Sequence, residues 1–229
     1  MAPTLIYFPI AGRAELIRLI AKVGGLDELE EVNVDFGSGL GVKRNLPLGL
    51  TAEEFGSPGG LPLLLHDDLK MNESGAIEMY VSLIAPKYKN LTPQQRAKDF
   101  QFCQLKESYI MAFGMPLFVG MTPEERASGF GSQKETFMPL YEKHFSVLEG
   151  ILPETGFVNG LDYPTPADLA IVNICEGYMP FGSTYKLAGL DMATSFPKLH
   201  AHNERVKAVP AVARALEESK HLKKALPTF

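Results

Sequence analysis

The sequence predicts an α/β domain at the N-terminus followed by an all-α domain at the C-terminus. In residues 1–84, short runs of β-favouring residues alternate with helical repeats of apolar residues. From about residue 92 onward no strand pattern returns, and only helical repeats are found. Ala85-Pro86 and a short polar stretch separate the two parts. We therefore expect one domain over residues 1–84 and a second over residues 92–229.

The first elements follow a β-α-β order. Residues 4–8 form a short apolar run with β-favouring side chains, which predicts a strand. Residues 13–22 then carry apolar side chains at helical spacing, and Gly24-Gly25 predicts the end of that helix. Residues 31–36 alternate between apolar and polar side chains, which predicts a second strand.

The segment Leu61 to Ile77 predicts a hairpin followed directly by a helix. Residues 63–65 are all Leu, residues 66–68 supply turn-forming side chains, and residues 69–71 can pair back as a second strand. Helical spacing begins just after Ser74. The order β-α-β followed by β-β-α is the order of a thioredoxin-like domain.

The start of this helix is the predicted ligand site. Its first N–H groups are free, and Glu73 and Ser74 place a carboxylate and a hydroxyl beside them. A small zwitterion could bind there, with its carboxylate on the helix start and its ammonium on Glu73. A cis bond before Pro62 would free the backbone of Leu61 to pair with an extended peptide. The alternative is that Asn72 or Ser74 only caps the helix.

The remaining stretches carry mostly structural signals. Residues 37–60 are rich in glycine and predict a loop with one short helix near residues 51–55. Thr-Pro pairs with a polar side chain three residues after the Thr predict three helix starts, at Thr92, Thr122 and Thr165. Further helices are expected over residues 132–152, 165–177, 197–208 and 210–222.

Composition excludes several classes of function. The chain has 229 residues, 45% of them hydrophobic, and a net charge of −5, which argues against a general nucleic-acid-binding protein. No apolar run is long enough to cross a bilayer, and no secretory signal is apparent, so a cytoplasmic location is expected. The histidines are scattered and predict no metal site. Cys103 and Cys175 are expected to be buried, reduced thiols.

Several motifs together resemble the cytosolic glutathione S-transferases. Residues 5–8 (LIYF), 12–15 (GRAE) and Arg18 are similar to the opening strand and helix of the tyrosine-type transferases. The proline-led hairpin followed by residues 73–77 (ESGAI) resembles their glutathione-binding segment. The similarity is greatest to the sigma class, which includes glutathione-dependent prostaglandin D synthases. It implies a homodimer that uses glutathione as co-substrate, with no metal.

The resemblance assigns roles to particular residues. Tyr7 matches the tyrosine whose hydroxyl donates a hydrogen bond to the glutathione sulfur and so stabilises the nucleophilic thiolate. Asp99 matches an acid that reaches glutathione in the neighbouring subunit. Lys43 or Arg44 would meet the glycine end of glutathione, because the chain has no Trp. The full set of implied glutathione-binding residues is Phe8, Arg13, Lys43, Leu61, Pro62, Glu73, Ser74 and Asp99.

The expected activity is conjugation of the glutathione thiolate to hydrophobic electrophiles. Isomerisation or peroxide reduction would use the same activated sulfur. The alternative from a different class is a binding or structural protein that has the same fold but little turnover. An aromatic and Met-rich set could border the electrophile site or could be helix core; its members are Tyr109, Met111, Phe113, Met115 and Phe118.

Overall fold

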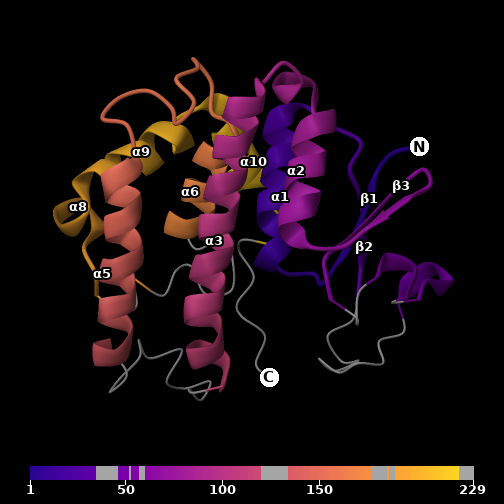
Figure 1. The fold of residues 1–229 in the computed structure, drawn as a ribbon, viewed down its shortest axis with the longest axis horizontal. Helices are drawn as coiled ribbons and strands as arrows, with labels where there is room; N and C mark the ends of the chain where they lie inside the picture. Colours follow the sequence, from indigo (N-terminus) through magenta and orange to yellow (C-terminus); the bar gives the residue numbers. More distant parts are fainter. Residues whose placement is uncertain are drawn as a thin grey trace.

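A four-stranded mixed sheet forms one side of the molecule in the computed structural model (Figure 1). The structure describes residues 1–34, 46–51, 53–56, 60–119, 134–176, 185 and 189–221. The strands lie in the order β2-β1-β3-β4, with β1 parallel to β2 and the other two pairs antiparallel. Their bounds are Thr4–Tyr7 for β1, Glu30–Asn33 for β2, Leu63–His66 for β3 and Leu69–Met71 for β4.

Two helices lie between the sheet and the helical part of the chain. Helix α1 spans Glu15–Gly24 and helix α2 spans Ser74–Ile84, and the two contact each other. The apolar side chains of α1 that the spacing singles out are all buried, as an amphipathic helix requires. Gly25 ends α1 in the left-handed region, with φ of 77°, where glycine has no steric penalty.

The rest of the described chain is helical. The longer helices are α3 (Pro93–Val119), α5 (Lys134–Ile151), α6 (Pro166–Cys175), α9 (Pro197–Lys207) and α10 (Pro210–Glu218), with a short α8 at Met192–Ser195. Short 3-10 helices occur at Gly12–Ala14, Pro47–Gly49, Glu53–Phe55 and Pro86–Tyr88. All ten residues of α6 are buried, and α6 contacts α1, α3 and α9. The predicted fold class, α/β followed by all-α, is confirmed.

The predicted Thr-Pro helix starts are found where the structure describes them. Thr92 precedes α3. The backbone N–H of Thr92 donates to the Gln95 side chain, and the backbone N–H of Gln95 donates to the Thr92 hydroxyl. Thr165 precedes α6, and the Thr165 backbone N–H donates to Asp168 at 2.8 Å. Asp168 also contacts His202 at 3.0 Å and is fully buried, so it joins the start of α6 to α9. The predicted start at Thr122 lies outside the described residues.

The aromatic and Met-rich set divides between core and surface. Tyr109 and Phe113 are buried and stack on each other with ring centroids 4.4 Å apart, which places them in the core of the helical part. Met111, on the same helix, is 61% exposed and faces the other way, toward the site described below. The side chains of Met115 and Phe118 are outside the described part of the chain. Cys103 and Cys175 are buried thiols, as predicted.

Two sequence predictions differ from the structure in extent. Strand β2 ends at Asn33, so the predicted strand over residues 31–36 is shorter at its end and one residue longer at its start. The expected short helix near residues 51–55 is a single 3-10 turn at Glu53–Phe55. Most of the predicted loop over residues 37–60 lies outside the described residues.

Candidate functional site

A cavity of about 620 Å³ lies between the start of α2 and one face of α3, and we call it the α2–α3 cavity. Its wall includes residues from three separated stretches: Arg13 just before α1, residues 60–62 before β3, and residues 72–76 at the start of α2. Helix α3 supplies the opposite wall through Phe100, Gln104, Glu107 and Met111. Five of the residues implied for glutathione binding line this one cavity: Arg13, Leu61, Pro62, Glu73 and Ser74.

The start of α2 has the form that the sequence predicts for an anion site. Glu73 precedes the helix with φ of 67°, an unusual conformation for a residue with a side chain, and makes no capping bond through that side chain. Residues 74–76 therefore begin the helix at the cavity wall, where their N–H groups have no partner within the helix. The capping alternative is wrong for Ser74, because its hydroxyl donates to Glu107 at 2.8 Å instead.

Glu107 on α3 connects the two walls of the cavity. Its Oε1 accepts from the Ser74 hydroxyl, and its Oε2 accepts from the Arg13 Nε at 3.0 Å. Behind it, the buried Lys106 ammonium lies 2.9 Å from Oε1. Burial by itself raises the pKa of Glu107, but the charges of Lys106 and Arg13 and these hydrogen bonds hold it below its ordinary value. Glu107 is therefore an ionised carboxylate at neutral pH.

Tyr7 lies beside the cavity, at the end of β1. Its hydroxyl accepts a hydrogen bond from the backbone N–H of Arg13 at 3.0 Å, and the residue is 7% exposed. Burial raises the pKa of Tyr7, although the Arg13 N–H and the charges of Arg13 and Arg18 act against this. The hydroxyl thus keeps its proton at neutral pH and can donate it in a hydrogen bond.

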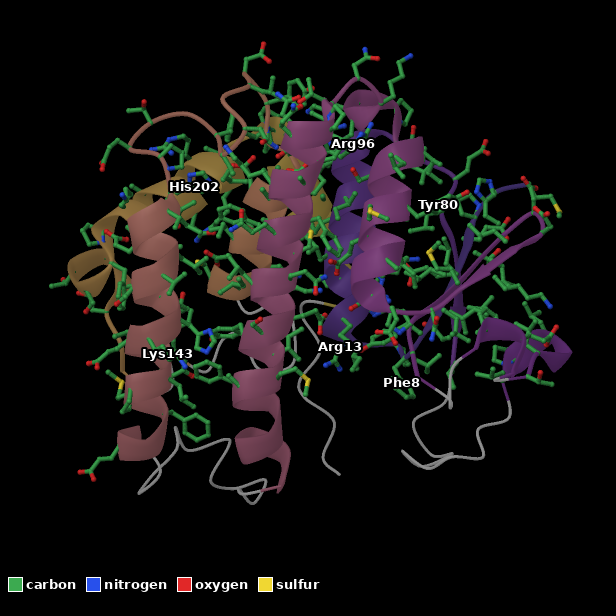
Figure 2. All side chains as sticks on the ribbon, in the orientation of Figure 1. Phe8, Arg13, Tyr80, Arg96, Lys143 and His202 are labelled. Atoms are coloured by element: carbon green, nitrogen blue, oxygen red, sulfur yellow. The ribbon has the colours of Figure 1, made fainter. Side chains whose placement is uncertain are left out.

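The other residues that sequence assigned to the site lie as follows. Phe8 is buried and packs edge-on against Tyr7, with ring centroids 5.5 Å apart, without lining the cavity. In Figure 2, Arg13 lies between α3 and the end of the sheet where Phe8 is labelled. The Leu61-Pro62 peptide bond is cis, the arrangement considered for this position. Lys43 and Arg44 lie outside the described residues.

The predicted role of Asp99 is wrong. Its side chain is 4% exposed and points toward the start of α6, away from the α2–α3 cavity. There the carboxylate accepts from the Thr165 hydroxyl at 2.6 Å, from the Ala167 N–H at 3.1 Å and from the Asn159 amide at 2.9 Å. All three bonds go to the same oxygen, Oδ1, and they tie α3 to the start of α6, so the structure gives Asp99 a structural role in place of the predicted contact with glutathione.

Sequence reasoning missed Glu107. Phe100, Gln104, Glu107 and Met111 recur at spacings of four, three and four residues, which places them on one face of α3. That signal was available, but the sequence does not say which face of the helix meets the ligand site. In the described part of the chain, no cluster of three or more His, Cys, Asp or Glu side chains could hold a metal ion. None of the described helices combines the length and apolar character that a bilayer crossing requires.

Comparison with known proteins gives similarities over nearly the whole chain, although no family model matches it. The chain is 25% identical over 217 residues to probable glutathione S-transferase 6 of Caenorhabditis elegans, which covers 92% of this chain and 93% of that protein. A solved glutathione S-transferase structure from the same organism is 26% identical, with a TM-score of 0.67, and the match covers 95% of this chain and 98% of that one.

A third similarity concerns the fold. The structure of a glutathione S-transferase from the hookworm Necator americanus, Na-GST-3, described as monomeric, aligns over 100% of both chains with a TM-score of 0.71 and 23% identity. With the fold described above and these similarities over nearly its whole length, the chain has the glutathione S-transferase fold and is similar in sequence to proteins named glutathione S-transferase.

Proposed function

We propose that the protein conjugates the thiolate of glutathione to small hydrophobic electrophiles. The observation that carries this proposal is the α2–α3 cavity, where five residues from separate parts of the sequence meet in one wall. The Tyr7 hydroxyl lies beside that wall, one hydrogen bond from the Arg13 backbone. Binding groups for a peptide and a donor for its sulfur are therefore adjacent.

The γ-glutamyl end of glutathione fits the start of α2. Its carboxylate would accept from the free N–H groups of residues 74–76, where the helix dipole also favours negative charge. Its ammonium would lie against the carboxylates of Glu73 and Glu107, both of which line the same cavity. The backbone of Leu61, before the cis proline, is the proposed partner of the cysteinyl residue, as in pairing with an added strand.

Tyr7 supplies the chemical step in this proposal. A free thiol has a pKa of about 8.5, so most of it is protonated at neutral pH and reacts slowly. A fixed hydroxyl that donates to the sulfur stabilises the thiolate over the thiol and increases the nucleophilic fraction. The Arg13 N–H occupies a lone pair of the Tyr7 oxygen and leaves its hydrogen for the sulfur. The thiolate then forms the bond to the electrophile, and the leaving group departs with its electron pair.

The proposal extends to class, domains and assembly. Tyr at position 7 supports the tyrosine type and, within it, the sigma class that the motifs resemble. We place the division between the two domains at residues 85–91, between α2 and α3. A homodimer is supported by exposed apolar side chains on α2 and α3, namely Met79, Leu83 and Phe100.

Titration calorimetry with glutathione and a panel of electrophiles tests the function. We expect glutathione to bind and at least one apolar electrophile to be conjugated, with the product identified by mass. Binding without turnover on any member of the panel would favour the alternative of a binding protein with this fold. Absence of glutathione binding would contradict the proposal itself.

A further inference from the structure

Lys106 on α3 is a cation enclosed within the protein. Its side chain is 1% exposed and lies between two carboxylates, those of Glu78 on α2 and of Glu107, its own neighbour on α3. Glu78 is itself fully buried. Burial of an ammonium and a carboxylate carries a desolvation cost that their attraction only partly offsets, and apolar side chains of similar size often serve stability equally well. Stability alone therefore does not account for this group.

The arrangement connects the protein interior with the α2–α3 cavity. Glu78 and Lys106 lie behind the cavity wall, whereas Glu107 is part of the wall and its side chain is 19% exposed. Consecutive residues of a helix do not normally face each other, so the contact between Lys106 and Glu107 constrains how the Glu107 side chain leaves the helix. Ser74 and Arg13 hold the same carboxylate from the other wall.

These three donors leave part of the Glu107 carboxylate available. A carboxylate has about four acceptor positions, and Lys106, Ser74 and Arg13 occupy three of them. The remaining one can take a donor from a ligand in the cavity. Burial lowers the pKa of Lys106, but Glu78 and Glu107 outweigh this and raise it to about 12, so the ammonium persists at any working pH.

We propose that Lys106 is a positioning residue for the ligand's ammonium group: it fixes the Glu107 carboxylate in the orientation that receives the γ-glutamyl ammonium, and Glu78 is the counter-ion that allows a buried cation there. This inference rests on the proposed binding of glutathione. Loss of Lys106 weakens recognition of the ammonium, because the Glu107 carboxylate is then no longer held in that orientation.

The test compares two ligands that differ only in the ammonium, glutathione and glutaryl-cysteinyl-glycine. The main variant is the double substitution Lys106→Met with Glu78→Met, which replaces the buried ion pair by apolar side chains of similar size and avoids an unpaired buried charge. We expect this protein to melt within a few degrees of wild type. Its affinity for glutathione should fall roughly tenfold, while its affinity for the analogue changes less than about twofold.

Two controls separate positioning from packing. Glu107→Gln should reproduce the same loss, selective for glutathione over the analogue. Ser82→Ala, at a buried position of α2 that does not line the α2–α3 cavity, should leave both affinities near wild type. The turnover number at saturating glutathione should be unchanged in the double variant, because Lys106 does not approach the sulfur site in this account.

Each result decides the inference. Equal affinity of the double variant and wild type for glutathione would overturn it, and so would an equal loss for both ligands, which is what a purely structural ion pair predicts. Failure of wild type to bind glutathione would overturn the proposed function and this inference with it. If the wild-type protein binds glutathione but the double variant loses affinity equally for both ligands, the inference is overturned and the proposed function stands.

Discussion

The backbone N–H of Arg13 donates a hydrogen bond of 3.0 Å to the hydroxyl of Tyr7. This contact fixes the oxygen of a buried tyrosine at the end of β1 and leaves the hydroxyl hydrogen to be donated elsewhere. Gly12 makes the contact possible: with φ of 44°, it turns the chain so closely over the ring that a Cβ there would lie 2.4 Å from the Tyr7 oxygen. Tyr7 is therefore positioned by the turn that follows its own strand.

Gly12→Ala is expected to disturb this position. The added carbon cannot coexist with the Tyr7 hydroxyl at 2.4 Å, so the turn and the tyrosine must move apart. Conjugation at neutral pH should fall at least tenfold, since a displacement of about 1 Å at a reacting group commonly costs that much or more. Steady-state kinetics with a fixed electrophile measures the effect.

Gly25→Ala is the matched control for Gly12→Ala. Gly25 also has a positive φ, of 77°, but nothing lies within 4 Å of a Cβ built there. The Gly25→Ala variant should lose about 1 kcal/mol of stability from backbone strain and keep the wild-type rate of conjugation. Equal rates in the two alanine variants would mean that the close approach of Gly12 has no role in catalysis.

Ser74→Ala and Glu73→Ala are expected to weaken glutathione binding more than they slow the bound complex. Both residues line the cavity where the γ-glutamyl group is proposed to bind, and neither is placed to touch the sulfur. Glu73→Ala removes a charge-assisted contact with the ligand's ammonium, and Ser74→Ala removes a bond that holds the Glu107 carboxylate beside that ammonium. Each change should cost about 1.5 to 3 kcal/mol of binding free energy. Calorimetric affinities together with turnover numbers at saturation separate the two effects.

Ser82→Ala is the control for Ser74→Ala. It removes a hydroxyl from the same helix, at another buried position that does not line the α2–α3 cavity. Its affinity for glutathione should equal that of wild type. If Ser74→Ala and Glu73→Ala also bind like wild type, the ligand is on a different helix.

The sequence predicted the elements and one wall of the cavity because local patterns encode them. The hairpin, the turn at residues 66–68 and the helix start at Ser74 follow from turn chemistry and spacing within 17 residues of chain. The opposite wall depends on how α3 is rotated about its axis, which is decided by contacts with α2 and α6 far away in sequence. The sequence pattern does not distinguish the surroundings of Glu107 from those of Asp99 on the same helix; tertiary packing places Glu107 at the cavity and Asp99 in the core.

The pKa of Asp99 makes a pH-dependent prediction. Burial raises it to about 6, while hydrogen bonds from Thr165 and Ala167 act in the lowering direction. The Asp99 carboxyl holds its proton more tightly in the folded protein than in the unfolded chain. Its ionisation therefore lowers the stability of the folded protein above about pH 6, and this loss is relieved as the pH falls below the folded pKa. Asp99→Asn does not titrate.

The stability advantage of wild type over Asp99→Asn should therefore be larger at about pH 4.5 than at about pH 7.5, by about 2 kcal/mol. Urea unfolding of both proteins at the two pH values measures this difference in stability. The contributions of the other titrating groups are nearly the same in both proteins and largely cancel in the comparison. A pH-independent difference would show that Asp99 has an ordinary pKa in the folded protein.

Assembly gives a further prediction. Leu83 on α2 is 43% exposed, and Met79 on the same helix and Phe100 on α3 are exposed apolar side chains as well. The wild-type protein should sediment at twice the chain mass of 25.1 kDa, and Leu83→Glu should shift it toward the single chain. Val147→Glu introduces the same charge at an apolar position on α5 that is similarly exposed, and it should leave the assembly unchanged. A wild-type protein that sediments only as a single chain would contradict the proposed dimer.

The central claim is that the Tyr7 hydroxyl stabilises the thiolate of bound glutathione, and the ultraviolet absorbance of that thiolate, followed against pH, tests it most directly. The comparison is between wild type and Tyr7→Phe, which removes one oxygen and keeps the ring. A lost hydrogen bond to a charged sulfur should raise the thiol pKa by about 1 to 2 units and slow conjugation at neutral pH roughly 10- to 100-fold, with little change in glutathione affinity. Identical thiol titrations in wild type and Tyr7→Phe would contradict the account.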